Sequence, residues 1–411
     1  MNSLLKNAKY VPLSIWMIGI SGFLLNISSA IVFGLSALYM KHSLGATLGL
    51  IAILEGSVEA FANLTKLLSG VLSDYLCKRK ILMVIGFAFA TLARPILALF
   101  PFVSAVILAR ILDRLGNGIH SAPRDALVGD LAPEEIKGTC FGLRQAFAQA
   151  GSCVGGGICY FLMVHSDNDY VFSFWMATVP VVLGLIILLV FVHEPESEVL
   201  KEEQKKTNGQ SVHHPLHLRD LKRLGFHFWI LMSFVAIFYL ARISENFLLL
   251  HANENFGYTE AQTQLILMFY NGSNSLVSYP IGMISDRIPR IRFLLVAVLL
   301  LIVADLILAF SSNNILMLLG VCIWGIQIGI AQSMFVALIV DKVPQDLRGV
   351  GIGIFYFLMS ISLFLCGAAA KQLLRVYDIA FVFGASGCIA VCSLICVFFL
   401  SKYFLNNKAN V

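Results

Sequence analysis

The sequence carries little charge. Asp, Glu, Lys and Arg together make up 13% of its 411 residues, and a soluble protein usually has about twice that share. Hydrophobic residues account for 58% of the chain, and the mean hydropathy is +0.84. This composition excludes an ordinary soluble globular protein and indicates one that resides in a lipid bilayer.

Several chemical patterns are also missing. There is no G-x-x-x-x-G-K-[ST] phosphate loop, which excludes ATP hydrolysis by that route. The nine cysteines have neither metal-ligand spacing nor an external disulfide framework. No nucleophile–base constellation is present, so we expect no enzyme activity, no cofactor and no metal. The first apolar run is too long for a cleavable signal peptide and lacks a small-residue cleavage site.

Long apolar runs fill most of the chain. Twelve are long enough to cross ~30 Å of hydrocarbon, six before the polar stretch 194–224 and six after it. They lie at 14–40, 48–73, 81–100, 103–122, 139–165, 170–193, 226–250, 260–285, 292–311, 313–340, 350–373 and 379–401. The sequence therefore predicts an all-α membrane protein with two six-helix halves, 1–193 and 225–411, joined by a cytoplasmic linker, 194–224.

Two stretches of the chain occur twice. Residues 126–142 (ALVGDLAPEEIKGTCFG) return 211 positions later as 337–353 (ALIVDKVPQDLRGVGIG), and residues 70–74 (GVLSD) return as 282–286 (GMISD). The nearly equal offsets predict pseudo-symmetric halves. In membrane proteins, paired halves around a central site are typical of alternating-access transporters.

Basic residues predict the orientation. With a cytoplasmic N-terminus, 20 Lys and Arg residues fall in cytoplasmic segments and 3 fall outside. Lys and Arg favour cytoplasmic loops, so both termini are expected inside the cell. This bias also accounts for the net charge of +5, and no nucleic-acid partner is expected.

The loop after the second span has a recognisable pattern. In the segment 70–79, a glycine is followed four residues later by Asp74 and then by the basic pair Lys78 and Arg79. This resembles the loop signature of the major facilitator superfamily, although Cys77 stands where the family usually has glycine. The second copy runs through Asp286 to Arg290. The resemblance covers essentially the whole chain and implies a twelve-helix transporter of that fold.

The two loop acids suggest a gate. A carboxylate just past a helix end is stabilised against the N-terminus of a neighbouring helix. We expect Asp74 near Gly349 and Asp286 near Gly138, latching the halves together on the cytoplasmic side. The alternative is that these loop charges only anchor topology.

The fourth span is unusually charged. Arg110, Asp113 and Arg114 are spaced i, i+3, i+4, so they share one helix face, which must avoid lipid. Residues 113–127 resemble the D-R-x-G-K-G-x-R-x-A-P-R-D-A-L signature of a bacterial subgroup of facilitator permeases, with Asn117 and His120 replacing two cations. The resemblance implies a bacterial inner-membrane location, and the cluster serves as a gate scaffold or as a substrate contact. The gating candidates are Asp74, Lys78, Arg79, Arg110, Asp113, Arg114, Arg124, Asp125, Asp130, Asp286, Arg290 and Asp341.

Polar residues inside the spans are candidates for substrate binding and coupling. Glu59 and Asn271 each lie about 16 Å from a cytoplasmic helix end, near the bilayer midplane, where transporters bind their substrates. A carboxyl group removed from water is harder to ionise, so Glu59 is a candidate proton carrier or, alternatively, a structural glutamate. The full set is Asn26, Glu55, Glu59, Tyr239, Arg242, Glu245, Asn246, Tyr270, Asn271, Asn274, Gln327 and Gln332.

These patterns predict a monomeric secondary transporter that moves a small polar organic solute, with protons as the coupling ion. Arg242 is the best candidate for binding a substrate carboxylate, unless Glu245 neutralises it. An efflux pump, a carboxylate-siderophore permease and a non-transporting sensor on the same fold are the alternatives.

Overall fold

The structure, a computed structural model, describes residues 10–76, 78–165, 169–194, 218–374 and 376–406. Within these ranges the chain forms thirteen α-helices and three short 3-10 helices, and no strand. The first set of α-helices is α2 (Leu13–His42), α3 (Leu48–Leu76), α4 (Arg79–Leu99), α5 (Val103–Leu131), α6 (Lys137–His165) and α7 (Tyr170–Phe191). The second set is α9 (Gly225–Leu240), α10 (Asn246–Phe256), α11 (Glu260–Ser285), α12 (Arg290–Ala309), α13 (Asn314–Lys342), α14 (Arg348–Leu373) and α15 (Ile379–Asn406). The 3-10 helices are Glu134–Ile136, Leu218–Leu224 and Gln345–Leu347.

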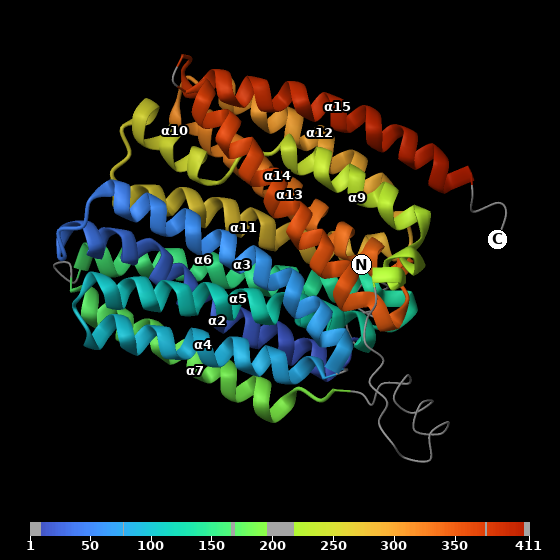
Figure 1. Cartoon of the computed structure of the whole chain (residues 1–411). Helices are drawn as coiled ribbons and strands as arrows, with labels where there is room; N and C mark the ends of the chain where they lie inside the picture. Colours follow the sequence, from blue (N-terminus) through green and yellow to red (C-terminus); the bar gives the residue numbers. More distant parts are fainter. Residues whose placement is uncertain (1–9, 77, 166–168, 195–217, 375, 407–411) are drawn as a thin grey trace.

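The helices run roughly side by side in two groups (Figure 1). In this view α2 to α7 form the lower part of the bundle and α9 to α15 the upper part. The two groups meet where α6 packs along α11 and where α3 packs along α14. These two pairs of long helices therefore form most of the contact between the two groups.

Eleven of the twelve predicted spans form a single helix each, with ends within a few residues of the prediction except for α5, which continues to Leu131. The prediction was wrong for 226–250, which is interrupted between Leu240 and Asn246. The carbonyl of Ala241 accepts a hydrogen bond from the Ser386 hydroxyl. That carbonyl is thus engaged by a side chain at the point where the helix would otherwise continue with its regular backbone bonds.

Nine helices in the described ranges are long and apolar enough to cross a membrane. The long helices α3, α5 and α11 are not among them, although they have 29, 29 and 26 residues. Helix α5 explains why, because its buried residues include Arg110, Asp113 and Asp125. Polar side chains that face the bundle interior lower the hydropathy of a spanning helix without exposing charge to lipid.

Candidate functional site

Asp74, at the end of α3, caps the start of α14. Its carboxylate accepts hydrogen bonds from the backbone amides of Gly349, at 3.0 Å, and Val350, at 2.7 Å. The Asp74 side chain is fully buried, and the first turn of a helix presents free N–H groups and a positive dipole. The predicted contact between Asp74 and the region of Gly349 is therefore confirmed.

Asp286, which follows α11, caps the start of α6 in the same way. One carboxylate oxygen accepts from the Gly138 amide at 2.6 Å. The other accepts from the Thr139 amide at 2.9 Å and from the Thr139 hydroxyl at 2.6 Å. This second predicted contact is also confirmed, and both contacts join the first set of helices to the second.

Ion pairs surround the Asp74 contact. Arg79 lies 3.4 Å from Asp74 and 3.0 Å from Asp130, at the end of α5. Asp130 in turn pairs with Arg348 at 2.8 Å. We call Asp74, Arg79, Asp130 and Arg348 the first latch. Its carboxylates and guanidinium groups alternate, so charge is compensated within the cluster.

An equivalent cluster surrounds the Asp286 contact. Arg290 lies 3.4 Å from Asp286 and also contacts Asp341 at the end of α13. Lys137 lies 3.8 Å from Asp341. We call Asp286, Arg290, Asp341 and Lys137 the second latch, and the end of the bundle that holds both latches the latch end. Both clusters therefore have the same arrangement of two carboxylates and two cationic groups.

Sequence reasoning missed Lys137 and Arg348 as latch residues. They occupy equivalent positions of the repeat and both carry a positive charge, which was the available signal. Lys78, by contrast, is exposed at the N-cap of α4. The α4 end is held instead by Glu194, which accepts from the backbone amides of Arg79 and Lys80.

Glycines let the latch helices approach closely. A Cβ at Gly349 would lie 2.5 Å from the Gly70 carbonyl oxygen and 2.7 Å from an Asp74 carboxylate oxygen. A Cβ at Gly138 would lie 2.6 Å from Asp286 and 2.7 Å from the Gly282 carbonyl oxygen. Side chains have no room at these crossings, so the capping geometry depends on glycine.

Further into the bundle, a buried carboxylate links the two groups again. Asp125 on α5 is fully buried and lies 2.9 Å from Arg124 and 3.3 Å from Arg144. The Tyr356 hydroxyl on α14 donates to it at 2.5 Å. Arg144 and Tyr356 were missed because an isolated Arg or Tyr in a span indicates no partner.

A hydrogen bond between two neutral side chains also links the two groups of helices. Gln145 on α6 donates to Gln332 on α13 at 2.7 Å. We call Asp125, Arg144, Tyr356, Gln145 and Gln332 the inner layer. Gln332 was predicted as a substrate residue, and the structure places it in this contact between the two groups of helices.

The charged face of α5 is partly tied to α4 and α2. Asp113 pairs with the fully buried Arg94 at 2.5 Å, and Arg94 also bonds Ser28 at 2.8 Å. Arg110 and Arg114 both lie over the Phe33 ring, at 5.7 and 5.6 Å from its centroid. All these contacts lie within the first set of helices, which favours a scaffold role.

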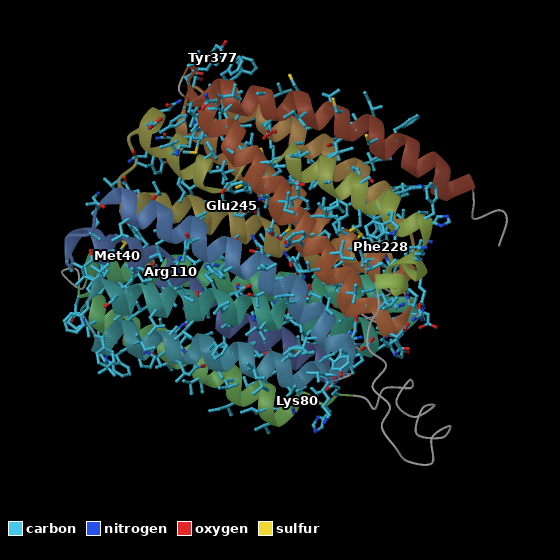
Figure 2. The ribbon with its side chains drawn as sticks, viewed as in Figure 1. Met40, Lys80, Arg110, Phe228, Glu245 and Tyr377 are labelled. Atoms are coloured by element: carbon cyan, nitrogen blue, oxygen red, sulfur yellow. The ribbon has the colours of Figure 1, made fainter. Side chains whose placement is uncertain are left out.

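A polar cluster forms where α9 gives way to α10. The Arg242 guanidinium donates to Glu245 at 2.8 Å and to the Tyr270 hydroxyl at 2.7 Å, and it stacks 4.4 Å from the Trp324 ring centroid. Arg242 is buried, whereas the Glu245 side chain is 40% exposed. Solvent therefore reaches one side of this cluster, on α9–α10, α11 and α13. Figure 2 labels Glu245 among the upper helices and Arg110 among the lower ones.

Three more polar residues lie one helical turn closer to the latch end. Tyr239 precedes Arg242 by three residues, Asn274 follows Tyr270 by four, and Gln327 follows Trp324 by three. Each of the three therefore shares a helix face with its partner in the polar cluster. All three are at most 1% exposed. We call Tyr239, Asn274 and Gln327, together with Arg242, the polar tier. At 1.5 Å per residue the three lie about 16–22 Å from the latch ends of their helices.

The polar tier holds buried atoms without hydrogen-bond partners among the described residues. These atoms are the Tyr239 hydroxyl, the Arg242 Nε, the Asn274 Nδ2 and both side-chain amide atoms of Gln327. An unpaired buried polar group costs about 1–3 kcal/mol, so such groups need a reason to be there. Other such atoms include those of the ion-paired arginines of the latches and the inner layer, Arg79, Arg144, Arg290 and Arg348. The five atoms of the polar tier lie midway along three neighbouring helices, which marks a candidate binding site.

Other candidates lie elsewhere. Asn26 donates to the Gly22 carbonyl within α2 at 2.7 Å and approaches Ser152, and Asn271 is half-buried on α11. The side chains of Glu55, Glu59 and Asn246 lie outside the described part of the structure.

A long helical bundle with matched capping clusters at one end and buried polar groups midway defines a multi-pass membrane transport protein. The family model described as Major Facilitator Superfamily matches residues 18–251 and 235–409. The chain belongs to this superfamily.

Relatives agree with that assignment, and solved structures share the fold. An uncharacterised MFS-type transporter of Methanocaldococcus jannaschii is 24% identical over 92% of this chain and 93% of its own length. The arabinose–proton symporter of Bacillus subtilis is 30% identical over 46% of this chain and 41% of its own. The solved structure of the proton:xylose symporter XylE has a TM-score of 0.72 at 16% identity, covering 95% of this chain and 96% of that one. The human organic anion transporter MFSD10 gives 0.72 at 14% identity, covering 94% and 100%.

Proposed function

We propose that this protein is a secondary active transporter that moves a small polar organic solute across the inner, or plasma, membrane by alternating access. The observation that carries the proposal is the polar tier. Its unpartnered atoms lie midway along the bundle, where two-fold related transporters bind their substrates. A bound solute would satisfy these groups and recover the free energy that they cost in the empty protein.

The latches supply the two states that alternating access requires. With both carboxylates capping their helices, the structure is closed at the latch end, which we propose faces the cytoplasm. Opening requires Asp74 and Asp286 to leave the helix N-termini and the inner layer to separate. A solute then shifts the population by binding one state more tightly than the other.

The available donors favour an acceptor-rich solute. The unpartnered N–H groups come from Arg242, Asn274 and Gln327, and the stacked Trp324 ring supplies an apolar side. Such a set suits the carboxylate, carbonyl or hydroxyl oxygens of an organic acid, a sugar or a carboxylate siderophore. It suits an apolar drug less well, although the quinolone resistance protein NorA of Staphylococcus aureus is 26% identical over 44% of this chain and 46% of its own.

We propose proton coupling as well, with Glu59 as one carrier. The similarity to a protein named as an arabinose–proton symporter supports this choice.

The test is a thermal-stability screen of the purified protein against sugars, organic acids and carboxylate siderophores. A ligand that stabilises the parent but not Arg242→Gln supports the proposed site, provided that the exposed-residue control Arg292→Gln still responds. Glu59→Gln should retain this stabilisation but reduce its dependence on pH. If no compound in the library stabilises the parent, or if the Arg242→Gln protein responds like the parent, the proposed site is wrong.

A further inference from the structure

Asp305, on α12, is a fully buried carboxyl group without a cationic partner. It accepts a hydrogen bond from Trp324 Nε1 at 3.2 Å and lies 2.7 Å from the Ser386 hydroxyl. Among the described residues, no Lys, Arg or His forms an ion pair with it. An isolated buried carboxylate is costly, and the neutral acid avoids most of that cost.

The surroundings of Asp305 hold few charges. Arg242 lies over the face of the Trp324 ring, whereas Asp305 accepts from the N–H at the edge of that ring. Arg242 is already paired with Glu245. Among the residues that the structure describes, the other titratable group that interacts with Asp305 is the thiol of Cys366 on α14. From α13 and α15 the direct contacts are the neutral donors Trp324 and Ser386. No group in this environment fully replaces the solvation that a carboxylate loses on burial.

The hydrogen bonds of Ser386 indicate the protonation state of Asp305. Its hydroxyl contacts two oxygens that both act as acceptors, the Ala241 carbonyl and the Asp305 carboxyl. A serine hydroxyl has only one hydrogen to donate. When that hydrogen goes to Ala241, the contact between Ser386 and Asp305 needs a hydrogen from the carboxyl group itself. The arrangement is therefore fully satisfied only when Asp305 is protonated and donates to Ser386.

We propose that Asp305 is a proton-binding site of this protein, protonated in this conformation, whose proton controls the junction between α9 and α10 through Ser386. The proposal rests on the proposed transport function for its role in coupling, whereas the protonation itself does not depend on it. The junction carries Arg242, so the proton site and the polar tier are mechanically connected.

Deprotonation changes this junction in a definite way. Asp305 transfers its proton to water, its charge falls from 0 to −1, and no other bond is broken. The Ser386 hydrogen then turns to the carboxylate, because a hydrogen bond to a charged acceptor is the stronger one. Ala241 loses its hydrogen bond to Ser386, and the new negative charge at the edge of the indole attracts Arg242, which lies over the indole face. Both changes alter the position of Arg242 relative to Glu245.

The experiment is infrared difference spectroscopy between acidic and alkaline samples of the purified full-length protein, without any solute. Protonated carboxyl groups absorb apart from carboxylates, so we expect the parent to show a carboxylic-acid band that Asp305→Asn lacks and that the exposed-residue control Glu135→Gln retains. The tryptophan fluorescence of the parent should change over the same pH range. That change should be absent in Asp305→Asn and in Trp324→Phe.

A second variant keeps the test decisive if Asp305→Asn does not fold. Ser386→Ala retains the acid but removes its hydrogen-bond acceptor, so the carboxylic-acid band should shift rather than vanish. A band unchanged in Ser386→Ala, or equally strong in Asp305→Asn and the parent, overturns the proposal. Because no solute is present, these outcomes are independent of whether the solute screen succeeds.

Discussion

Arg94 and Asp305 stand 211 residues apart, at equivalent positions of the internal repeat, and each hydrogen-bonds a residue nineteen positions further along the chain. Arg94 donates to Asp113 at 2.5 Å, and Asp305 accepts from Trp324 at 3.2 Å. One group of helices thus holds a buried ion pair where the other holds an acid and an indole. The repeat preserves the contact but not its charge, which gives the two sites different electrostatic roles.

This difference predicts unequal effects of the same substitution. Asp113→Asn leaves the buried Arg94 without its counter-charge and should destabilise the protein by about 3–5 kcal/mol. Asp305→Asn replaces a neutral acid by a neutral amide that can still donate to Ser386, and should change stability by less than about 1 kcal/mol. Chemical denaturation of both variants in the same detergent compares them directly. Equal losses would show that Asp305 carries a charge that contributes to folding.

The latch acids should control the closed state. Asp74→Asn places an amide NH2 toward the N–H groups of Gly349 and Val350 and should cost about 1.5–3 kcal/mol of closed-state stability. We expect a larger population with a separated latch end, and a further increase with Asp286→Asn. The measurement is the distance distribution between spin labels at Lys78 and Lys342, which are exposed at that end, in a cysteine-free background.

The control for the latch experiment is Glu135→Gln. This exposed acid lies close to the latches in sequence and makes no ion pair among the described contacts. The substitution removes one negative charge at the latch end, as Asp74→Asn does, but it removes no helix cap. It should therefore leave the distance distribution unchanged. A shift as large as that of Asp74→Asn would point to net charge, rather than helix capping, as the cause.

The latches could be predicted from the sequence because their information is local and duplicated. A glycine, an acid four residues later and basic residues after it occur at the same helix ends in both copies, and a carboxylate there has one favourable partner, a helix N-terminus. Most span boundaries could be predicted as well, because a helix that crosses the bilayer needs an apolar run of a definite length. The exceptions are α5, which continues to Leu131, and the interrupted span 226–250.

The inner layer and the proton site could not be predicted in this way. Tyr356 reaches Asp125 from a position 231 residues away, and Ser386 reaches Ala241 across 145 residues. Neither contact has a counterpart pattern in sequence, because side-chain pairing between packed helices depends on their rotation. The break at 241–245 was missed as well, because the residue that bonds its first carbonyl, Ser386, lies on a distant helix.

Glycine at the latch crossings should be required for closure. Gly349→Ala places a methyl group within 2.7 Å of both the Gly70 carbonyl oxygen and Asp74, closer than van der Waals contact allows, so the helices must separate. We expect the spin-label distances to shift toward the open population, as in Asp74→Asn. Gly367→Ala on the same helix is the matched control, because its Cβ would meet no atom within 4 Å. Closure of the Gly349→Ala protein to parental distances would contradict this account.

Tyr356→Phe should weaken the inner layer without unfolding the protein. The variant removes one hydrogen bond to a charged group, worth about 1.5–3 kcal/mol, while Asp125 keeps Arg124 and Arg144 as partners. If the inner layer and the first latch stabilise the closed state independently, the effects of Tyr356→Phe and Asp74→Asn on the free energy of closure should add. A double-mutant cycle measured by the same spin labels tests this. Strong non-additivity would mean that the two levels open as one unit.

Gln327 is expected to lower the stability of the empty protein and to contribute to solute binding. Both side-chain amide atoms are buried and have no hydrogen-bond partner among the described residues. Gln327→Leu, which has a similar volume, should therefore stabilise the empty protein by about 1–3 kcal/mol. The same variant should lose the stabilisation given by a solute from the screen, because the donor and acceptor that recognise it are gone. Thermal unfolding with and without that solute measures both effects. A leucine variant that is more stable and still responds to the solute would remove Gln327 from the binding site, whereas a loss of stability would show that its amide already has a partner in the solvated protein.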